Sequence, residues 1–308
     1  MTADRVMVFA PAPVLTVTIE QQADAVELHV HGGGQGVWEA RMITSLGCQV
    51  TLCASVGGEV GLVLEKLLAD EGVAVRTVQR QASSGWYVHD RRDGSRKEIA
   101  EDPGAPMVRH DIDELYNLAL AEGLRSRVAL LSGPADPSMV DAEVFRRLAA
   151  DLGANEVLVV ADLSGEHLAA AVAGGAAFVK VSHEELVDDG RAHDDSAEAL
   201  IAAGRELLSA GAGSVLISRA ELSALALFAD RVVEVCVPRL QVADHRGAGD
   251  SLTAGVAAVL ARGGNLDEAI RTGAAAGALN VTRHGLGSGR ADAVRAILDR
   301  VTLRDWAS

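Results

Sequence analysis

Short apolar runs alternate with stretches of helical periodicity along most of the chain. Strands are predicted where β-branched and aliphatic residues follow one another, at residues 128–132, 157–162, 177–181 and 214–218. Helical spacing follows the first three runs, at about 140–152, 165–174 and 182–187. Runs that are apolar throughout are typical of strands covered on both faces. The alternation therefore predicts an α/β fold, with right-handed crossovers and a mostly parallel sheet between two layers of helices.

Two segments, at residues 13–34 and 85–101, break this alternation because they look like strands without intervening helices. The polar sequence DRRDGSRK in the second segment indicates a hairpin turn. These strands form either a small sheet beside the main one, placed as a lid over a cleft, or an antiparallel edge of the main sheet. Since no repeat or low-complexity linker interrupts the chain, we expect a single domain over residues 1–308, with lid segments at about 12–31 and 84–101.

Composition narrows the class of protein. The 308 residues, 49% hydrophobic and 23% charged, suit one large globular domain. A net charge of −15 argues against a nucleic-acid partner, although it permits a small anionic ligand. Cys48, Cys53 and Cys236 have no metal-type spacing and suit a reduced, cytoplasmic protein. We expect no signal peptide and no membrane partner, because the most apolar later run, 168–179, is too short to span a bilayer.

The sequence RGAGDS, from Arg246 to Ser251, stands directly before an alanine-rich helical pattern. In one interpretation Asp250 caps that helix, a common use of aspartate after a glycine turn. In the other, the backbone N–H groups of the glycine turn and the helix N-terminus hold phosphate oxygens. Asp250 would then take a proton from an attacking hydroxyl. Taken alone, the motif favours the cap.

Two further strand-to-helix junctions carry candidate chemistry. The sequence HGGGQGVWEAR at 31–41 does not fit a dinucleotide fingerprint, because Val37 stands where the last glycine is needed. It is either a tight turn or a place where the backbone approaches a polar ligand such as a sugar. The sequence VKVSHEEL at 179–186 places Glu184 and Glu185 in a first helical turn. Acids there usually complement the helix dipole, but they also suit Mg²⁺ held through waters.

The order of these motifs is more specific than any one of them. A pattern GG-x-G-x-x-x-AR-x-x-x-x-LG comes first, VGGEVGLVLEKLLADEGV follows at 56–73, and an intact GAGDSLTAG comes late, at 247–255. This resembles the ribokinase-like (PfkB) carbohydrate kinases, and among them the branch with 1-phosphofructokinase and tagatose-6-phosphate kinase. The resemblance covers nearly the whole chain and includes 131–134, 159–168, 179–186 and 275–289.

The resemblance implies a three-layer α/β/α domain with a mostly parallel sheet and a small β lid, and transfer of the ATP γ-phosphoryl group to a sugar hydroxyl. It implies Asp250 as general base, with the amides of Gly247, Ala248 and Gly249 as the anion hole. It implies that Glu185 supports Mg²⁺, and that two chains form a homodimer through their lids. The implied nucleotide-binding positions are Ser182, Glu185, Ser218, Arg246, Asn280 and Gly285.

The departures from the family lie mainly on the substrate side. The implied sugar-contacting residues are Gly33, Gly34, Gln35 and Trp38. Among them, Gln35 replaces a lysine and Trp38 an asparagine, while Val14 stands at an acidic position. The expected lid arginine is Ser84 or Gly85.

On the nucleotide side, the family's N-x-x-E motif has become Ser182-His-Glu-Glu185. Two hypotheses follow from these departures. In the first, the protein is an ATP- and Mg²⁺-dependent kinase for a sugar or sugar phosphate outside the usual set. In the second, it is a non-catalytic binding or regulatory protein whose substrate contacts have eroded.

Overall fold

A large sheet forms the centre of the computed structural model, which describes residues 4–283 and 287–306. Its strand order is β14 (Thr302–Asp305), β13 (Val232–Cys236), β12 (Leu222–Leu227), β11 (Val215–Arg219), β10 (Phe178–Ser182), β9 (Leu158–Asp162), β8 (Val128–Ser132), β1 (Arg5–Phe9), β4 (Gln49–Gly57) and β5 (Ala74–Arg80). Neighbours from β11 to β5 pair in parallel. The predicted parallel sheet is therefore confirmed.

Beyond β11 the sheet continues through β12, β13 and β14, which pair antiparallel. The strands predicted from the sequence end at residue 218 and do not include this extension. β11, β12 and β13 follow one another without an intervening helix, so the strand–helix alternation carries no trace of β12 and β13, whereas β14 joins the edge only after α8, α9 and α10.

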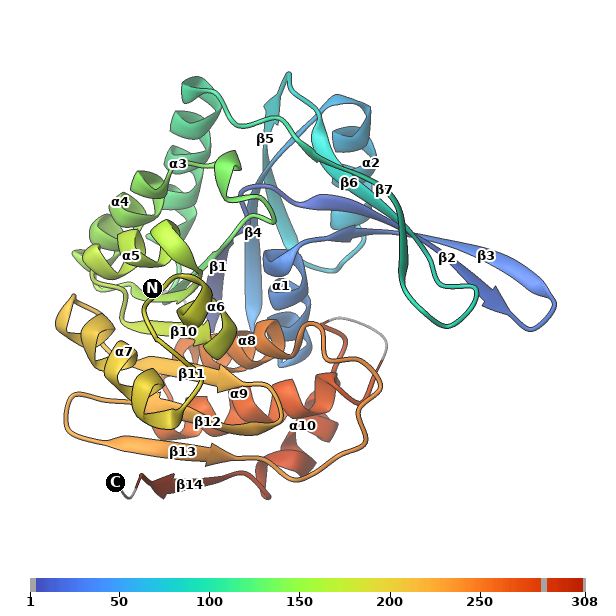
Figure 1. Cartoon of the computed structure of the whole chain (residues 1–308). Coiled ribbons are helices and arrows are strands. Elements are labelled where there is room, and N and C mark those ends of the chain that lie inside the picture. Colours follow the sequence, from blue (N-terminus) through green and yellow to red (C-terminus); the bar gives the residue numbers. More distant parts are fainter. Residues whose placement is uncertain (1–3, 284–286, 307–308) are drawn as a thin grey trace.

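Helices cover both faces of the sheet, which confirms the three-layer α/β/α prediction (Figure 1). One layer contains α3 (Arg109–Gly123), α4 (Ala142–Gly153), α5 (Gly165–Ala173), α6 (His183–Asp188) and α7 (Ala197–Ser209). The other contains α1 (Gln35–Ser45), α8 (Ala248–Ala261), α9 (Leu266–Asn280) and α10 (Ala291–Leu298). A short 3₁₀ turn, η1, spans Pro137–Met139. Each layer buries its own apolar cluster against one face of the sheet.

A second sheet, called the lid here, has the strand order β3 (Ala25–Gly33), β2 (Val14–Gln22), β6 (Ser84–Asp90) and β7 (Lys97–Gly104). It projects from the α/β body beside α2 (Gly58–Ala69), as Figure 1 shows. The alternative that these strands extend the main sheet is wrong. A Cβ on Gly32 would lie 3.0 Å from Leu68, so β3 runs directly against α2.

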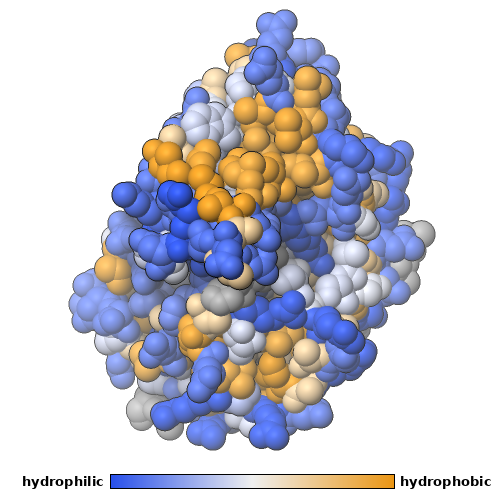
Figure 2. Space-filling model, turned by 90° about the vertical axis from the view of Figure 1, so that its right-hand side faces the viewer, coloured by the Kyte–Doolittle hydropathy of each residue, from blue (hydrophilic) through white to orange (hydrophobic). Residues whose placement is uncertain are grey.

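The two faces of the lid differ in polarity. On β2, Thr16 and Thr18 are buried, whereas Leu15, Val17 and Ile19 alternate with them and are only partly covered. On β3 the apolar side chains are more exposed still, at 60% for Val26 and 64% for Leu28. Figure 2, which views the molecule from the lid side, shows apolar side chains gathered in one continuous patch. The lid thus covers its polar face and leaves its apolar face open.

Candidate active site

The GAGD turn begins α8 at the carboxyl edge of the main sheet. Gly247 is the N-cap with φ +70°, a left-handed conformation that favours glycine. A Cβ on Gly249 would lie 2.7 Å from Nζ of Lys180, so this position admits no side chain without displacing the ammonium. Asp250 is the third helical residue, and no side chain caps the helix. The interpretation of Asp250 as the cap is therefore wrong.

The carboxylate of Asp250 faces two others. Oxygens of Glu39, Asp162 and Asp250 all lie within 4.8 Å of one another, and we call these three residues the carboxylate cluster. Glu39 is fully buried and Asp162 is 2% exposed. Burial, and next the charge of Asp162, raise the pKa of Asp250 to about 7. A carboxyl with such a pKa accepts a proton readily near neutral pH.

Lys180 supplies positive charge at this site. Its Nζ donates to Oδ1 of Asp162 over 3.2 Å, and the side chain is 8% exposed. Burial alone would lower the pKa of Lys180, but Asp162, Glu185 and Asp250 raise it above its ordinary value, so the ammonium stays charged. Thr253 donates its hydroxyl to Oδ2 of Asp162 over 2.6 Å. Asp162 is thus held by a cation and a hydroxyl at once.

Glu39, Asp162 and Lys180 are not among the site residues predicted from the sequence. Two of them carry a signal in the sequence: Asp162 ends the apolar run of β9, and Lys180 interrupts that of β10. A charged residue in a strand buried on both faces needs a partner, and the carboxyl ends of parallel strands share one edge. Glu39 has no such signal, because one acid on a helix is usually solvated.

The predicted Mg²⁺ and nucleotide residues at the start of α6 form a capping box. The Ser182 hydroxyl accepts from the Glu185 amide over 3.1 Å, and the Glu185 carboxylate accepts from the Ser182 amide over 2.7 Å. Both side chains therefore stabilise the helix N-terminus. Ser218 lies in the last part of β11, one residue before the strand ends at Arg219, and its carbonyl lies 3.3 Å from Nδ1 of His183. Glu185 can stabilise the helix N-terminus and still bind Mg²⁺. Its second carboxylate oxygen has no hydrogen-bond donor among the described residues and is free to coordinate the ion.

Asn280 ties the GAGD turn to α9. Its side chain is 1% exposed, donates to the Arg246 carbonyl over 2.6 Å and accepts from the Ser251 hydroxyl over 3.1 Å. These bonds fix the backbone on both sides of the turn. The other nucleotide-site prediction in this region, Gly285, lies outside the described residues.

The predicted sugar-contacting residues lie at the start of α1. Gly34 is the N-cap with φ +105°, and a Cβ on Gly33 would lie 2.4 Å from the Thr16 hydroxyl of the lid. Gln35 donates its amide to the Asp162 carbonyl over 3.0 Å, so this amide joins α1 to β9. The indole N–H of Trp38 is buried and has no acceptor among the described residues.

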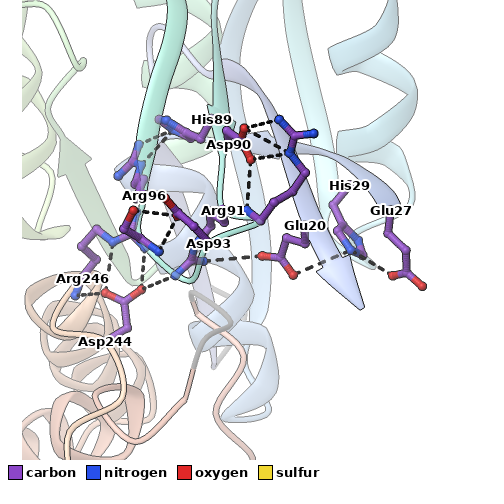
Figure 3. A network of polar contacts seen from close by, with 12 residues as sticks. Glu20, Glu27, His29, His89, Asp90, Arg91, Asp93, Arg96, Asp244 and Arg246 are labelled. Carbon is purple, nitrogen blue, oxygen red and sulfur yellow. Dashed lines mark hydrogen bonds and ion pairs between the residues drawn. The ribbon is translucent and has the colours of Figure 1, made fainter. Parts of the chain in front are cut away.

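A polar network joins the lid to the loop before the GAGD turn (Figure 3). Arg246 donates to both oxygens of Asp244, over 3.0 and 2.5 Å. Arg91, which directly follows β6 of the lid, lies 3.8 Å from the same carboxylate. Farther into the lid, Arg96 donates to Nε2 of His89 over 3.0 Å, and burial followed by the charge of Arg96 lowers the pKa of His89 to about 4. Arg246 is therefore engaged with Asp244, which also lies against Arg91 of the lid.

Together these features define a class of protein: a doubly wound α/β protein whose sheet edge carries a glycine-bounded helix N-terminus suited to phosphate groups. Residues 8–293 match the model of the pfkB family carbohydrate kinases, and the chain belongs to that family. The family assignment made from the order of motifs is confirmed.

Relatives and solved structures agree with this assignment. The chain is 29% identical over 257 residues to ATP-dependent 6-phosphofructokinase isozyme 2 of Escherichia coli K12, covering 82% of each protein. It is 25% identical to 1-phosphofructokinase of Bacillus subtilis, covering 83% of each. The structure of phosphofructokinase-2 from E. coli in complex with potassium superposes with a TM-score of 0.84 at 26% identity, covering 97% of this chain and 99% of the other.

The protein is therefore a sugar kinase, an enzyme that transfers a phosphoryl group from ATP to a sugar, and ATP and Mg²⁺ are the cofactors of its family. Across residues 4–283 and 287–306, no helix combines the length and apolar character needed to span a membrane.

Proposed function

We propose that the enzyme moves the γ-phosphoryl group of ATP to a hydroxyl of a sugar or sugar phosphate, with Asp250 as the general base. The observation that carries this proposal is the position of Asp250. Its carboxylate accepts no hydrogen bond from the described residues, stands in the first turn of α8 and has a pKa raised to about 7 by burial and by Asp162. A base with that pKa is well suited to take the proton of an attacking hydroxyl when the reaction runs at neutral pH.

The amides of Gly247, Ala248 and Gly249 are proposed to hold the transferred group. Their support is the geometry of the turn: the first N–H groups of a helix have no intrahelical acceptor and carry partial positive charge. Lys180 adds a full charge beside Gly249. The residues present therefore fit a nucleotide phosphate, and Glu185 offers a carboxylate to Mg²⁺, which neutralises phosphate charge when bound.

The acceptor is proposed to lie outside the usual set of phosphosugars. Gln35 carries no charge, and its amide is engaged with the Asp162 carbonyl over 3.0 Å. Val14 offers no hydrogen bond, and Trp38 presents a ring where the family has an amide. A site that lacks these contacts does not select substrates by the hydroxyl or phosphate groups that such residues would bind.

The test is phosphotransfer across a panel of sugars, sugar phosphates and nucleosides, with Asp250→Asn beside the wild type. We expect kcat for the best acceptor to fall about 10²–10⁴-fold in the variant, the usual contribution of general base catalysis. Asp188→Asn, which changes a carboxylate at the end of α6, is the matched control and should leave kcat unchanged. Equal turnover by the wild type and Asp250→Asn would rule out the assigned base.

The second candidate function is a binding or regulatory protein with little or no turnover. Val14, Gln35 and Trp38 favour it, because all three remove polar contacts from the substrate side. Isothermal titration against the same panel separates the two candidates. Binding of a sugar without turnover by the wild type would support the second function, and robust turnover would exclude it.

We also propose that two chains form a homodimer through their lids. The exposed apolar face, which includes Val26, Leu28 and Val30, supports this, because contiguous apolar surface marks interaction sites. Leu28→Asp should convert the dimer to a monomer in light scattering coupled to size exclusion, since a carboxylate would be buried at the contact. Leu222→Asp is the control, because Leu222 is also 64% exposed but lies on the main sheet. A wild-type monomer would contradict the proposal.

A further inference from the structure

A groove lies at the edge of the main sheet opposite to the GAGD turn, and no part of the proposed reaction takes place there. Strands β1, β4 and β5 begin at this edge, at Arg5, Gln49 and Ala74, and run parallel toward the catalytic edge. The groove has a volume of about 320 Å³, which is within the range of small-molecule sites. We call it the amino-edge groove. Its polar lining side chains are those of Arg5, Thr44, Cys48, Gln49 and Thr51.

The lining of the groove offers hydrogen-bond donors, and no carboxylate belongs to it among the described residues. The side chain of Arg5 is 26% exposed, and its Nη2 donates to the Thr51 hydroxyl over 3.4 Å, which leaves most of its N–H groups open. Gln49 is exposed at the first position of β4, and its side-chain amide has no hydrogen-bond partner among the described residues. A guanidinium and an amide side by side are suited to the oxygens of an anion.

The charges around the groove leave an excess of guanidinium groups. One carboxylate oxygen of Glu122 lies 3.7 Å from Nη2 of Arg5, and the other accepts from Nη1 of Arg125 over 3.0 Å, so two guanidinium groups share this acid. Arg262 donates to Sγ of Cys48 over 3.5 Å and has no carboxylate partner among the described residues. Burial raises the pKa of the Cys48 thiol, so the thiol adds no negative charge.

Two further acids lie near the groove. Glu71, beside Gly72 of the lining, is held by Arg41 through two nitrogens of the guanidinium group. Asp4, the residue before Arg5, has no such partner among the described residues, and its charge acts on Cys48. Three guanidinium groups therefore face two carboxylates, although the whole chain has a net charge of −15. This local balance favours an anionic ligand.

We propose that the amino-edge groove binds a phosphomonoester of a small metabolite, with Arg5 and Gln49 donating to the phosphate oxygens. Guanidinium groups bind phosphate through paired N–H bonds, and phosphate is the anion that best uses this geometry. The groove is larger than a phosphate group, and Val50 and Ala74 line it beside the polar side chains. The carbon skeleton of a sugar or a nucleoside would occupy that part.

A ligand in this groove acts as an effector, because the catalytic edge lies at the other end of the same elements. β1 runs from Arg5 to Phe9, and Ala10 after it lines a small pocket together with Gln35. α1 begins at Gln35 and ends at Ser45, with Thr44 of its last turn in the groove. Since two rigid elements border both sites, binding at one is coupled to binding of the acceptor at the other. This part of the inference rests on the proposed kinase function.

The first experiment titrates glucose 6-phosphate and AMP into the nucleotide-free enzyme by isothermal calorimetry, with inorganic phosphate as the reference. One of the two esters should bind more tightly than inorganic phosphate, and its identity distinguishes a sugar from a nucleoside skeleton. Arg5→Gln should weaken that binding about tenfold or more, because charge-assisted hydrogen bonds are lost. Gln49→Leu changes an exposed position and should weaken it several-fold, which keeps the test meaningful if Arg5→Gln folds poorly.

Arg205→Gln is the matched control, because Arg205 is an exposed arginine on α7, away from the groove, and the variant should bind the ester as the wild type does. Equal binding by the wild type, Arg5→Gln and Gln49→Leu would overturn the site and would place the ester at the catalytic edge. Esters that bind the wild type no more tightly than inorganic phosphate would overturn the assignment to a metabolite.

The second experiment measures KM for the best acceptor with and without the tighter ester at constant MgATP. KM should change about twofold or more in the wild type and stay constant in Arg5→Gln. A wild type that does not respond, or the same response in both proteins, would overturn the effector role. The calorimetric titration needs no turnover, so its outcome is independent of whether the proposed kinase function holds.

Discussion

The lid and the catalytic edge of the main sheet both contain clustered charged side chains. They differ in whether each charge has a partner of opposite sign and in how far it is exposed to water. In the lid network the charges are paired and accessible. Arg92 spans both oxygens of Asp90, and Arg91 lies 3.8 Å from Asp244 and is 22% exposed. Water screens such pairs, so each adds little free energy and serves mainly to set geometry.

At the catalytic edge Glu39, Asp162 and Lys180 are buried and Asp250 is partly exposed, and the acids outnumber the lysine. Among the described residues the carboxylate cluster faces one cation, Lys180, and burial together with neighbouring acids raises the pKa of each of its three members. Removing water strengthens every interaction here, favourable or not. The same residue types thus perform structural work in the lid, where each charge has a partner, and chemical work at the sheet edge, where Glu39, Asp162 and Lys180 are withheld from solvent.

The largest effect on stability is expected from Lys180→Met, which breaks a buried ion pair. Asp162 would keep Thr253 but lose its cation, and an uncompensated buried charge typically costs about 3–5 kcal/mol. We expect this loss in the free energy of unfolding, measured by urea denaturation at pH 8 and a fixed protein concentration.

The matched control for this variant is Lys66→Met, which removes a pair of similar length, 2.8 Å to Asp70, with the lysine side chain 75% exposed. Its loss should stay within about 1 kcal/mol, as for other surface pairs. Similar losses in the two variants would break the distinction between the two regions.

The pH dependence sharpens the comparison, because Asp250 should give activity and stability opposite trends. Its pKa is raised from 3.8 to about 7 in the folded state. The native protein therefore binds this proton more tightly than the unfolded chain, and the stability it contributes is lost as pH rises from about 4 to about 7. The base is active only without the proton, so kcat/KM should fall about tenfold per unit below pH 7.

This prediction is checked by pH–rate profiles at low free Mg²⁺ and by urea unfolding of the wild type and Asp250→Asn. The variant lacks the group and should lose less stability than the wild type over that pH range. A wild type that gains stability relative to the variant as pH rises would contradict the assignment.

The smallest effect is expected in the lid. Arg91→Ala removes the contact between the lid hairpin and Asp244, and should cost less than about 1 kcal/mol of stability. Because the contact bridges the lid and the loop before the GAGD turn, we expect KM for the acceptor to rise a few-fold with kcat nearly unchanged. Arg92→Ala, whose partner Asp90 lies in the lid itself, should change neither. A loss of kcat in Arg91→Ala alone would assign the lid pair a direct part in catalysis.

Local sequence determined the parallel part of the fold. Fully apolar runs predicted the bounds of β8, β9, β10 and β11 to within about one residue. A strand that is buried on both faces must be apolar at every position, so its sequence is easily recognised. The order of the glycine motifs along the chain was sufficient to identify the family. In RGAGDS, the backbone conformation at Gly247 follows from the absence of a side chain, so the turn was predictable from the residues themselves.

Only the tertiary structure decided what surrounds Asp250. Residues 39, 162, 180 and 250 belong to α1, β9, β10 and α8, and they meet because parallel strands end at a common edge. No local pattern distinguishes Glu39 from a solvated helix acid, and none shows that the lid buries its polar face. Periodicity reports which positions are apolar, whereas the pairing of distant charges depends on how the crossovers bring the elements together.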